Sequence, residues 1–309
     1  MTRFGDFKPL CSQVPSYPWC NLFYRQVEHH NSSVFNSVSS DPATAPVGVN
    51  PECAIPRAGN GNLGNIANTV ACALSIVFVG LLIFWTSRRR AAVGRLEFRI
   101  FLVLYFLTLP LQLLSTGSFL EQGSTALTAI TAVHAGLVTA TFWALLANAI
   151  VSTQVVEDGT ISALLPFDFF AAAFFAATTY IALDVAFSFS NVFGPSNPLS
   201  DLNSIALFVL TSIWPGVAVI LYLVIMTYVV LGMLNEVRPM WYYVLAAVLF
   251  VLSQLDFFLL GKVICNGTNN KVDGSFVATI LETAAVGVLY AAWRSITEES
   301  WEDEVYYPR

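Results

Sequence analysis

Charged residues are scarce in this chain of 309 amino acids, making up 11% of it against about 25% in average soluble proteins. Hydrophobic residues make up 56% and gather in long runs. This balance lies well outside the soluble range, so the composition indicates a protein that crosses a membrane several times. The densest groups of charge are an arginine-rich loop and an acidic tail. They give no support for nucleic acid as a partner.

Lysine and histidine are almost missing from the apolar runs. The only lysines are Lys8, Lys262 and Lys271. None lies within a predicted membrane span, which excludes a retinal protein because a retinal Schiff base needs a lysine inside a helix. His29 and His30 precede the first run, so only His134 lies in one. A metal-dependent hydrolase needs several ligands converging on the metal. The sequence therefore predicts no catalytic residue, no metal site and no cofactor.

Seven apolar runs are long enough to cross a bilayer as helices, which takes about 20 residues each. The predicted spans are 66–87, 98–118, 125–151, 161–187, 204–231, 240–260 and 276–295. The expected fold class is therefore an all-α polytopic membrane protein, a bundle of seven transmembrane helices. Residues 1–65 form an amino-terminal segment before the transmembrane domain, 66–295, and an acidic tail follows at 296–309.

The distribution of arginines predicts which way the bundle faces. Arg88-Arg89-Arg90 follow the first span at once, and Arg95 and Arg99 come shortly after. Positive charge stays on the cytosolic side, so the amino terminus is expected in the lumen or outside the cell, and the carboxy terminus in the cytosol. Arg238 and Arg294 fall at cytosolic ends in the same scheme. The residues before the first span lack the pattern of a cleavable signal peptide, so that span is expected to target the chain.

Four cysteines fall on the lumenal or extracellular side of this topology: Cys11, Cys20, Cys53 and Cys265. In an oxidising compartment they can form two disulfides by three connectivities. We favour Cys11–Cys20 with Cys53–Cys265, and leave open that some thiols stay free. Two N-glycosylation sequons, at Asn31 and Asn266, lie on the same side.

Five polar residues lie inside the predicted spans at similar depth, roughly 6–10 Å from the lumenal end or somewhat deeper. They are Asn68, His134, Asp184, Asp256 and Glu282. Ionisable groups at this depth are costly and suggest function. If they face inward, they form one polar layer. One interpretation is a ligand or proton site with Asp256 and Glu282 as a carboxylate pair. The favoured one is a set of interhelical hydrogen bonds near a hydrated mouth.

Span three carries a stripe of small residues at four-residue spacing: Ala132, Gly136, Ala140 and Ala144. Small residues let helices approach closely in membranes, so we expect this stripe at the centre of the bundle. The alternative is a docking groove for a partner's helix. Pro110 and Pro215 are expected to interrupt spans two and five. At the cytosolic membrane interface, where amphipathic rings prefer to lie, we expect Trp241, Tyr242, Tyr243 and Trp293.

The acidic tail contains Glu302-Asp303-Glu304. Such tails are usually solvated and disordered. A sharper hypothesis is that Glu302 and Glu304 form a two-acid sorting signal read by vesicle coat proteins that select cargo leaving the endoplasmic reticulum.

Several short motifs, taken in order along most of the chain, resemble the fungal chitin synthase export chaperones. They are Phe4-Gly5-Asp6-Phe7 with Cys11, Pro18 and Cys20; Ala67-Asn68-Thr69; Val93-Gly94-Arg95 with Glu97; Phe142-Trp143-Ala144-Leu145-Leu146; Glu157-Asp158-Gly159-Thr160; and Cys265 followed by Asp273-Gly274. Each motif is short and weakly specific by itself. The occurrence of all of them in the same order is what makes the resemblance specific. The chain departs from the family pattern mainly between Cys53 and Asn68, around Pro56.

The resemblance implies a non-catalytic membrane protein of the endoplasmic reticulum, which binds a chitin synthase and is required for its export to the cell surface. Its expected partners are the synthase and the membrane lipids around it. Whether it stays with the synthase as a subunit is left open. The alternatives are a seven-helix receptor-like signalling protein, which would give a ligand-dependent signal, and an intramembrane hydrolase, which would lose activity on mutation of Asp256, Glu282 or His134.

Overall fold

The computed structural model describes residues 3–35, 44–45, 47–58, 63–89, 94–190 and 192–297. Arg90 and the acidic tail with Glu302 and Glu304 lie outside them. Within these residues, seven helical stretches are long and apolar enough to cross a membrane. They are α3 (Ile66–Arg88), α4 (Arg95–Thr116), α5 (Thr125–Ser152), α6 (Ile161–Phe187), Ile205–Met233, Arg238–Gly267 and α11 (Gly274–Thr297). All seven predicted spans are thus present.

The fifth and sixth stretches each combine several helical segments. Span five runs through α7 (Ile205–Phe208), a π-helical turn, α8 (Trp214–Thr227) and a second π-helical turn at Tyr228–Met233. Span six joins α9 (Arg238–Leu255), a π-helical turn at Asp256–Leu260 and α10 (Gly261–Gly267). Span six was expected to end at 260. It continues because the wider turn is followed by regular helix, which places Cys265 in a helical turn rather than a loop.

The two prolines behave differently. Pro215 follows the π-helical turn Val209–Ile213, and such a wider turn relieves the clash between a proline ring and the preceding turn. Pro110 lies inside α4, which runs without interruption. The expected interruption is therefore seen as a change of helix type in span five only.

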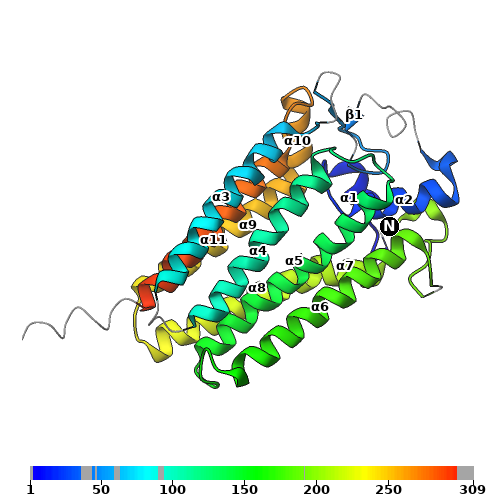
Figure 1. Ribbon diagram of the computed structural model, residues 1–309. Helices are drawn as coiled ribbons and strands as arrows, with labels where there is room; N and C mark the ends of the chain where they lie inside the picture. Colours follow the sequence, from blue (N-terminus) through cyan, green and yellow to red (C-terminus); the bar gives the residue numbers. More distant parts are fainter. Residues whose placement is uncertain are drawn as a thin grey trace, which may run out of the picture.

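The helices pack in a closed arrangement. Along one side α9, α11, α3 and α4 lie next to one another, and α5 then contacts α4, α6 and α8 (Figure 1). The bundle is completed by α8 and α9, which make only limited contact with each other. Two ends can be defined. The arginine end carries Arg88, Arg95 and Arg238, and the capped end is the one covered by residues 3–35, 44–45 and 47–58.

The cap consists of short elements on one end of the bundle (Figure 1). They are α1 (Lys8–Gln13), α2 (Cys20–His30), a 3₁₀ turn at Ser32–Val34 and the paired strands β1 (Thr44–Ala45) and β2 (Ile55–Pro56). Helix α2 packs on α5 and α6. Phe7 and Phe23 are fully buried and share one apolar cluster with Ala132, Ala182 and Leu207 of the spans. The amino-terminal segment is therefore continuous with the bundle core.

A second apolar cluster fills the arginine end. Trp293 stacks on Phe98, with ring centroids 5.2 Å apart and planes 7° apart. Tyr243 is also buried, next to Tyr222. Of the four rings expected at the membrane interface, Trp241 and Tyr242 are exposed. The rings of Tyr243 and Trp293 instead point into the core, because the sequence predicts how far along a helix a residue lies but not its direction around the helix axis.

The small-residue stripe of α5 faces inward against α6. Ala132, Ala140 and Ala144 are buried. A Cβ atom added to Gly136 would lie 2.2 Å from Thr179 Oγ1 and 2.7 Å from the carbonyl oxygen of Phe175. At Gly136 the stripe thus brings two helices of the same chain together, and its alanines are buried inside the bundle, where the sequence placed them.

Replacing Gly136 with alanine is expected to destabilise the protein by about 1–3 kcal/mol, because the new methyl group meets α6 backbone that cannot move aside. The measurement is the melting temperature of the purified protein in mild detergent. Gly216→Ala is the matched control, since a Cβ atom there meets no atom within 4 Å. Equal melting temperatures for the two variants would contradict the close approach of α5 and α6.

Candidate functional site

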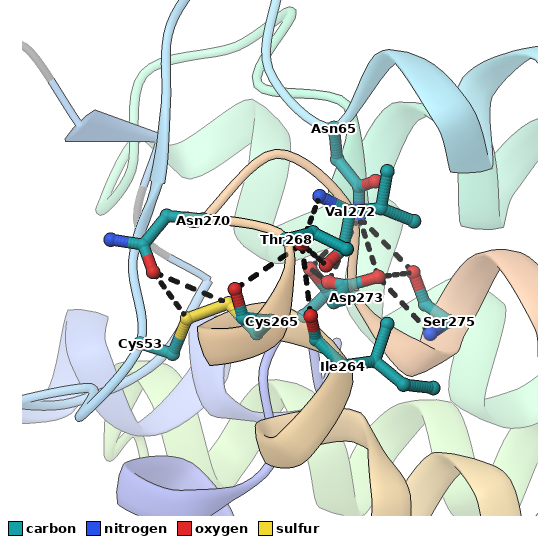
Figure 2. The surroundings of a disulfide bond; sticks show 10 residues. Cys53, Asn65, Ile264, Cys265, Thr268, Asn270, Val272, Asp273 and Ser275 are labelled. Carbon is teal, nitrogen blue, oxygen red and sulfur yellow. Dashed lines mark hydrogen bonds between the residues drawn. A yellow bond between two sulfur atoms is a disulfide. The ribbon is translucent and has the colours of Figure 1, made fainter.

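Two disulfides fasten the cap. Cys11 is bonded to Cys20, which ties α1 to the start of α2. Cys53 is bonded to Cys265 in α10, across a sequence separation of 212 residues (Figure 2). These are the two pairs favoured from the sequence. Cys72 is the free cysteine, buried within α3.

Beside the second disulfide lies a network centred on Asp273 (Figure 2). The hydroxyls of Ser16 and Ser275 both donate to its carboxylate. Asn65 Nδ2 donates to Asp273 Oδ2 over 3.2 Å, and also to Ser16 Oγ over 2.9 Å. Asp273 is fully buried. One carboxylate therefore joins the cap, the start of α3 and the start of α11.

Gly274 explains how α11 begins so close to span six. A Cβ atom added to Gly274 would lie 2.7 Å from Gly261 Cα. Only a residue without a side chain fits at this approach. In the sequence, Asp273 and Gly274 stood out only as part of the family resemblance. Their spacing has no pattern of its own that indicates a junction.

A cavity of about 370 Å³ lies inside the bundle, between α4, α5, α8, α9 and α11. The end of the cavity nearer the cap is lined by Tyr17, Pro18 and Trp19. Most of its lining is apolar or aromatic. The polar side chains that also line it include Gln112, His134, Thr211, Ser212, Gln254 and Glu282.

Three members of the predicted polar layer lie at or beside this cavity. His134 and Glu282 line it. Glu282 Oε1 accepts a hydrogen bond from Gln254 Nε2 over 2.9 Å. Asn68 is fully buried, donates to Thr116 Oγ1 over 3.0 Å and accepts from Thr279 Oγ1 over 2.9 Å. The interhelical hydrogen bonds expected at this depth are therefore present between spans one, two and seven and between spans six and seven.

Asp184 and Asp256 do not join the other three. Asp184 accepts hydrogen bonds from the backbone N–H and the hydroxyl of Ser190, just after α6 ends. Asp256 does not line the cavity, and its backbone carbonyl lies against Gly274. It is two residues past Gln254, and two helical residues turn a side chain by about 200°. The proposed carboxylate pair of Asp256 and Glu282 is therefore not assembled in the cavity.

At the arginine end, two loops hold each other through reciprocal hydrogen bonds. Gly94 N–H donates to Asp158 Oδ2 over 2.8 Å, and Gly159 N–H donates to Glu97 Oε1 over 2.7 Å. Both glycines have positive φ, 63° and 67°, a conformation that glycine adopts without strain. Glu97 is fully buried. This clasp joins two motifs that carried the family resemblance separately.

The opening motif is also fixed by a distant segment. Phe7 N–H donates to the carbonyl of Leu202 over 3.0 Å, and Ser204 N–H donates to the carbonyl of Gly5 over 3.0 Å. A Cβ atom at Gly5, whose φ is 82°, would lie 2.9 Å from Ile205 Cα. The start of the chain is thereby held against the entry to span five.

The two sequon asparagines, Asn31 and Asn266, are exposed at the capped end. Asn31 accepts a hydrogen bond from Ser33 N–H over 3.1 Å.

Among the described residues, His, Cys, Asp and Glu form no group of three or more able to hold a metal. The candidate site therefore consists of an internal cavity in a bundle whose two ends are held by disulfides and hydrogen-bond networks.

Burial raises the pKa of Asp273 above its usual value, and the hydrogen bonds from Ser16, Ser275 and Asn65 oppose part of that rise. A carboxyl group with a higher pKa in the folded state binds more protons when folded. Its contribution to stability is therefore present below the unfolded pKa and is lost as the pH rises through the folded pKa. Wild-type protein is expected to lose stability relative to Asp273→Asn as the pH rises above about 4, the ordinary pKa of an aspartate. Melting temperatures of both proteins at and above that pH measure it, and parallel profiles would refute it.

A family model described as chitin synthase export chaperone matches residues 3–307. Curated relatives bear the same description. The one from Chaetomium globosum is 29% identical over 307 residues, covering 98% of this chain and 85% of the relative. Those from Gibberella zeae and Phaeosphaeria nodorum are 26% and 27% identical, covering 99% and 98% of this chain and 85% of each relative. No solved structure matches the chain. Since the family model covers nearly all of it, the chain belongs to the chitin synthase export chaperone family.

Proposed function

We propose that this protein is a membrane chaperone that binds a chitin synthase in the endoplasmic reticulum and enables its folding and export to the plasma membrane. The observation that carries the proposal is the family match along residues 3–307. Its role is binding rather than catalysis. Two disulfides at one end of the bundle support an oxidising compartment on that side.

The proposed mechanism is stoichiometric binding within the bilayer. A polytopic client exposes polar groups and irregular helix surfaces until its own helices have assembled. In hydrocarbon such groups have no water to bond, so a partner bundle that covers them lowers the free energy of the unassembled client. The fastened ends of this bundle suit that task, because a rigid partner loses little conformational entropy on binding.

The capped end is proposed to face the lumen, and the arginine end the cytosol. Glycosylation tests this. If Asn31 or Asn266 is lumenal and reached by the transferase, endoglycosidase treatment of the protein will increase its gel mobility. The shift should shrink with Asn31→Gln or Asn266→Gln, and vanish in the double variant. An untreated double variant that migrates with treated wild-type protein is the internal control. Glycosylation of a sequon newly placed in the 152–160 loop would overturn the orientation.

Deleting the gene in its own host is expected to leave at least one fluorescently tagged chitin synthase in the endoplasmic reticulum, because the unassembled client is retained there. Microscopy and surface chitin staining measure this, and the wild-type gene should restore both. An unrelated polytopic protein of the plasma membrane should travel normally in the same cells. Normal export of every synthase would refute the function.

Co-purification separates binding from indirect effects. The affinity-tagged protein, extracted in mild detergent from endoplasmic reticulum membranes, should carry the retained synthase with it. Recovery of the same pair from plasma membrane would further identify it as a lasting subunit. Failure to recover the synthase from either membrane would contradict direct binding.

A further inference from the structure

The internal cavity opens sideways, between spans five and six. Most of its lining residues are buried or half-buried, and the two exposed ones are Gly216 in α8 and Phe258 in the π-helical turn of span six. A Cβ atom added to Gly216 would meet nothing within 4 Å. Helices α8 and α9 also make only limited contact with each other. Phe258 lies against Tyr17 of the cap, with ring centroids 5.8 Å apart. The mouth of the cavity is therefore the part of this gap beside Gly216.

This mouth lies at membrane depth. Gly216 follows the start of span five at Ile205, which places it roughly 16 Å along the helix at 1.5 Å per residue. Such a position is within the hydrocarbon core, about 30 Å thick. A molecule that enters through the mouth therefore comes from the lipid phase rather than from water.

The lining is divided along the bundle axis. Toward the arginine end it is formed by Leu145, Leu223, Val286 and Leu289 and by aromatic rings. Tyr222 and Tyr243 reach this part as well, but their hydroxyls bond to each other. The polar groups collect in the half nearer the cap. The cavity is thus shaped for a molecule with an apolar body and a small polar head.

The polar half contains one buried nitrogen atom without a hydrogen-bond partner and a carboxylate that can accept a further hydrogen bond. His134 is buried, with 4% of its surface exposed, and its Nδ1 atom has no hydrogen-bond partner. Trp19 lies against the same imidazole ring, with ring centroids 5.0 Å apart. Glu282 offers carboxylate oxygens to the same cavity. A hydroxyl group is chemically suited to each of them, because it can donate to the carboxylate and can either donate to or accept from an imidazole nitrogen.

A phosphate-bearing head does not fit. No lysine or arginine is present among the residues that line the cavity. A buried phosphate needs such cations or several donors to replace its hydration. A neutral head can instead be satisfied by one or two hydrogen bonds.

We propose that this cavity binds one molecule of a neutral lipid with a hydroxyl head, a sterol or a diacylglycerol, which enters between α8 and α9. The hydroxyl bonds to Glu282 and His134, and the apolar body extends toward the arginine end. Binding of this lipid is independent of synthase binding, so either proposal can fail while the other stands.

The test uses the purified full-length protein with photoactivatable, clickable analogues of a sterol, of diacylglycerol and of phosphatidylcholine. Wild-type protein should be labelled by one or both neutral analogues about tenfold more than by phosphatidylcholine, and excess unlabelled lipid of the same kind should suppress the labelling. Labelled peptides should map to spans five, six or seven. The analogue that labels the protein identifies the kind of lipid that binds.

Two variants locate the site. Gly216→Trp fills the mouth and should reduce labelling about tenfold. Val217→Trp is the matched control, because Val217 is the adjacent exposed residue and does not line the cavity, so its labelling should be unchanged. Glu282→Leu removes the carboxylate that bonds to the lipid hydroxyl but leaves the mouth open. This variant should also show reduced labelling. Equal labelling by phosphatidylcholine, undiminished labelling of a folded Gly216→Trp, or no suppression by unlabelled lipid in wild-type protein would overturn the proposal.

Discussion

The absence of water from the hydrocarbon core is the constraint on which the structure depends. Every backbone N–H and carbonyl group within a span must be bonded internally, and helices do this. The same constraint applies to polar side chains. Many hydroxyls in the spans donate to a carbonyl one turn earlier, as Thr131 does to Leu127 and Thr86 to Leu82. Asn68 has no such local solution, and it joins three helices by reaching Thr116 and Thr279.

The strongest fastenings lie at the two ends of the bundle, where the hydrocarbon constraint relaxes. The cap is held by two disulfides and by the Asp273 network. The arginine end is held by the clasp between Glu97, Asp158 and the two glycines. Between these ends the cavity lies among α4, α5, α8, α9 and α11, and spans five and six make only limited contact beside it. Fixed ends and an open middle are what a bundle needs if it keeps its shape while binding something within the membrane.

The sequence was sufficient for the spans because the length and polarity of an apolar run are properties of the run itself. The topology also placed four cysteines on one side, but it left three connectivities open, and the structure shows the favoured one. Depth along a helix was readable for Asp184 and Asp256, but the direction of a side chain around the helix was not. A single π-helical turn shifts that direction for every residue after it. The hydrogen bonds between the Gly94 and Gly159 loops could not be predicted from the sequence for a different reason. The loops of Gly94 and Gly159 bond to each other only because α4 and α6 begin near each other, which no local pattern encodes.

The bond between Cys53 and Cys265 ties the order of synthesis to the closure of the cap. Cys53 is made 212 residues before its partner, and translation runs from the amino to the carboxy end. The bond therefore cannot form until six spans have been made and α10 has been delivered to the same side of the membrane. Asp273, which completes the junction, emerges later still. A nascent or truncated chain keeps Cys53 as a free thiol, so oxidation of this one pair distinguishes a nearly finished bundle from an incomplete one.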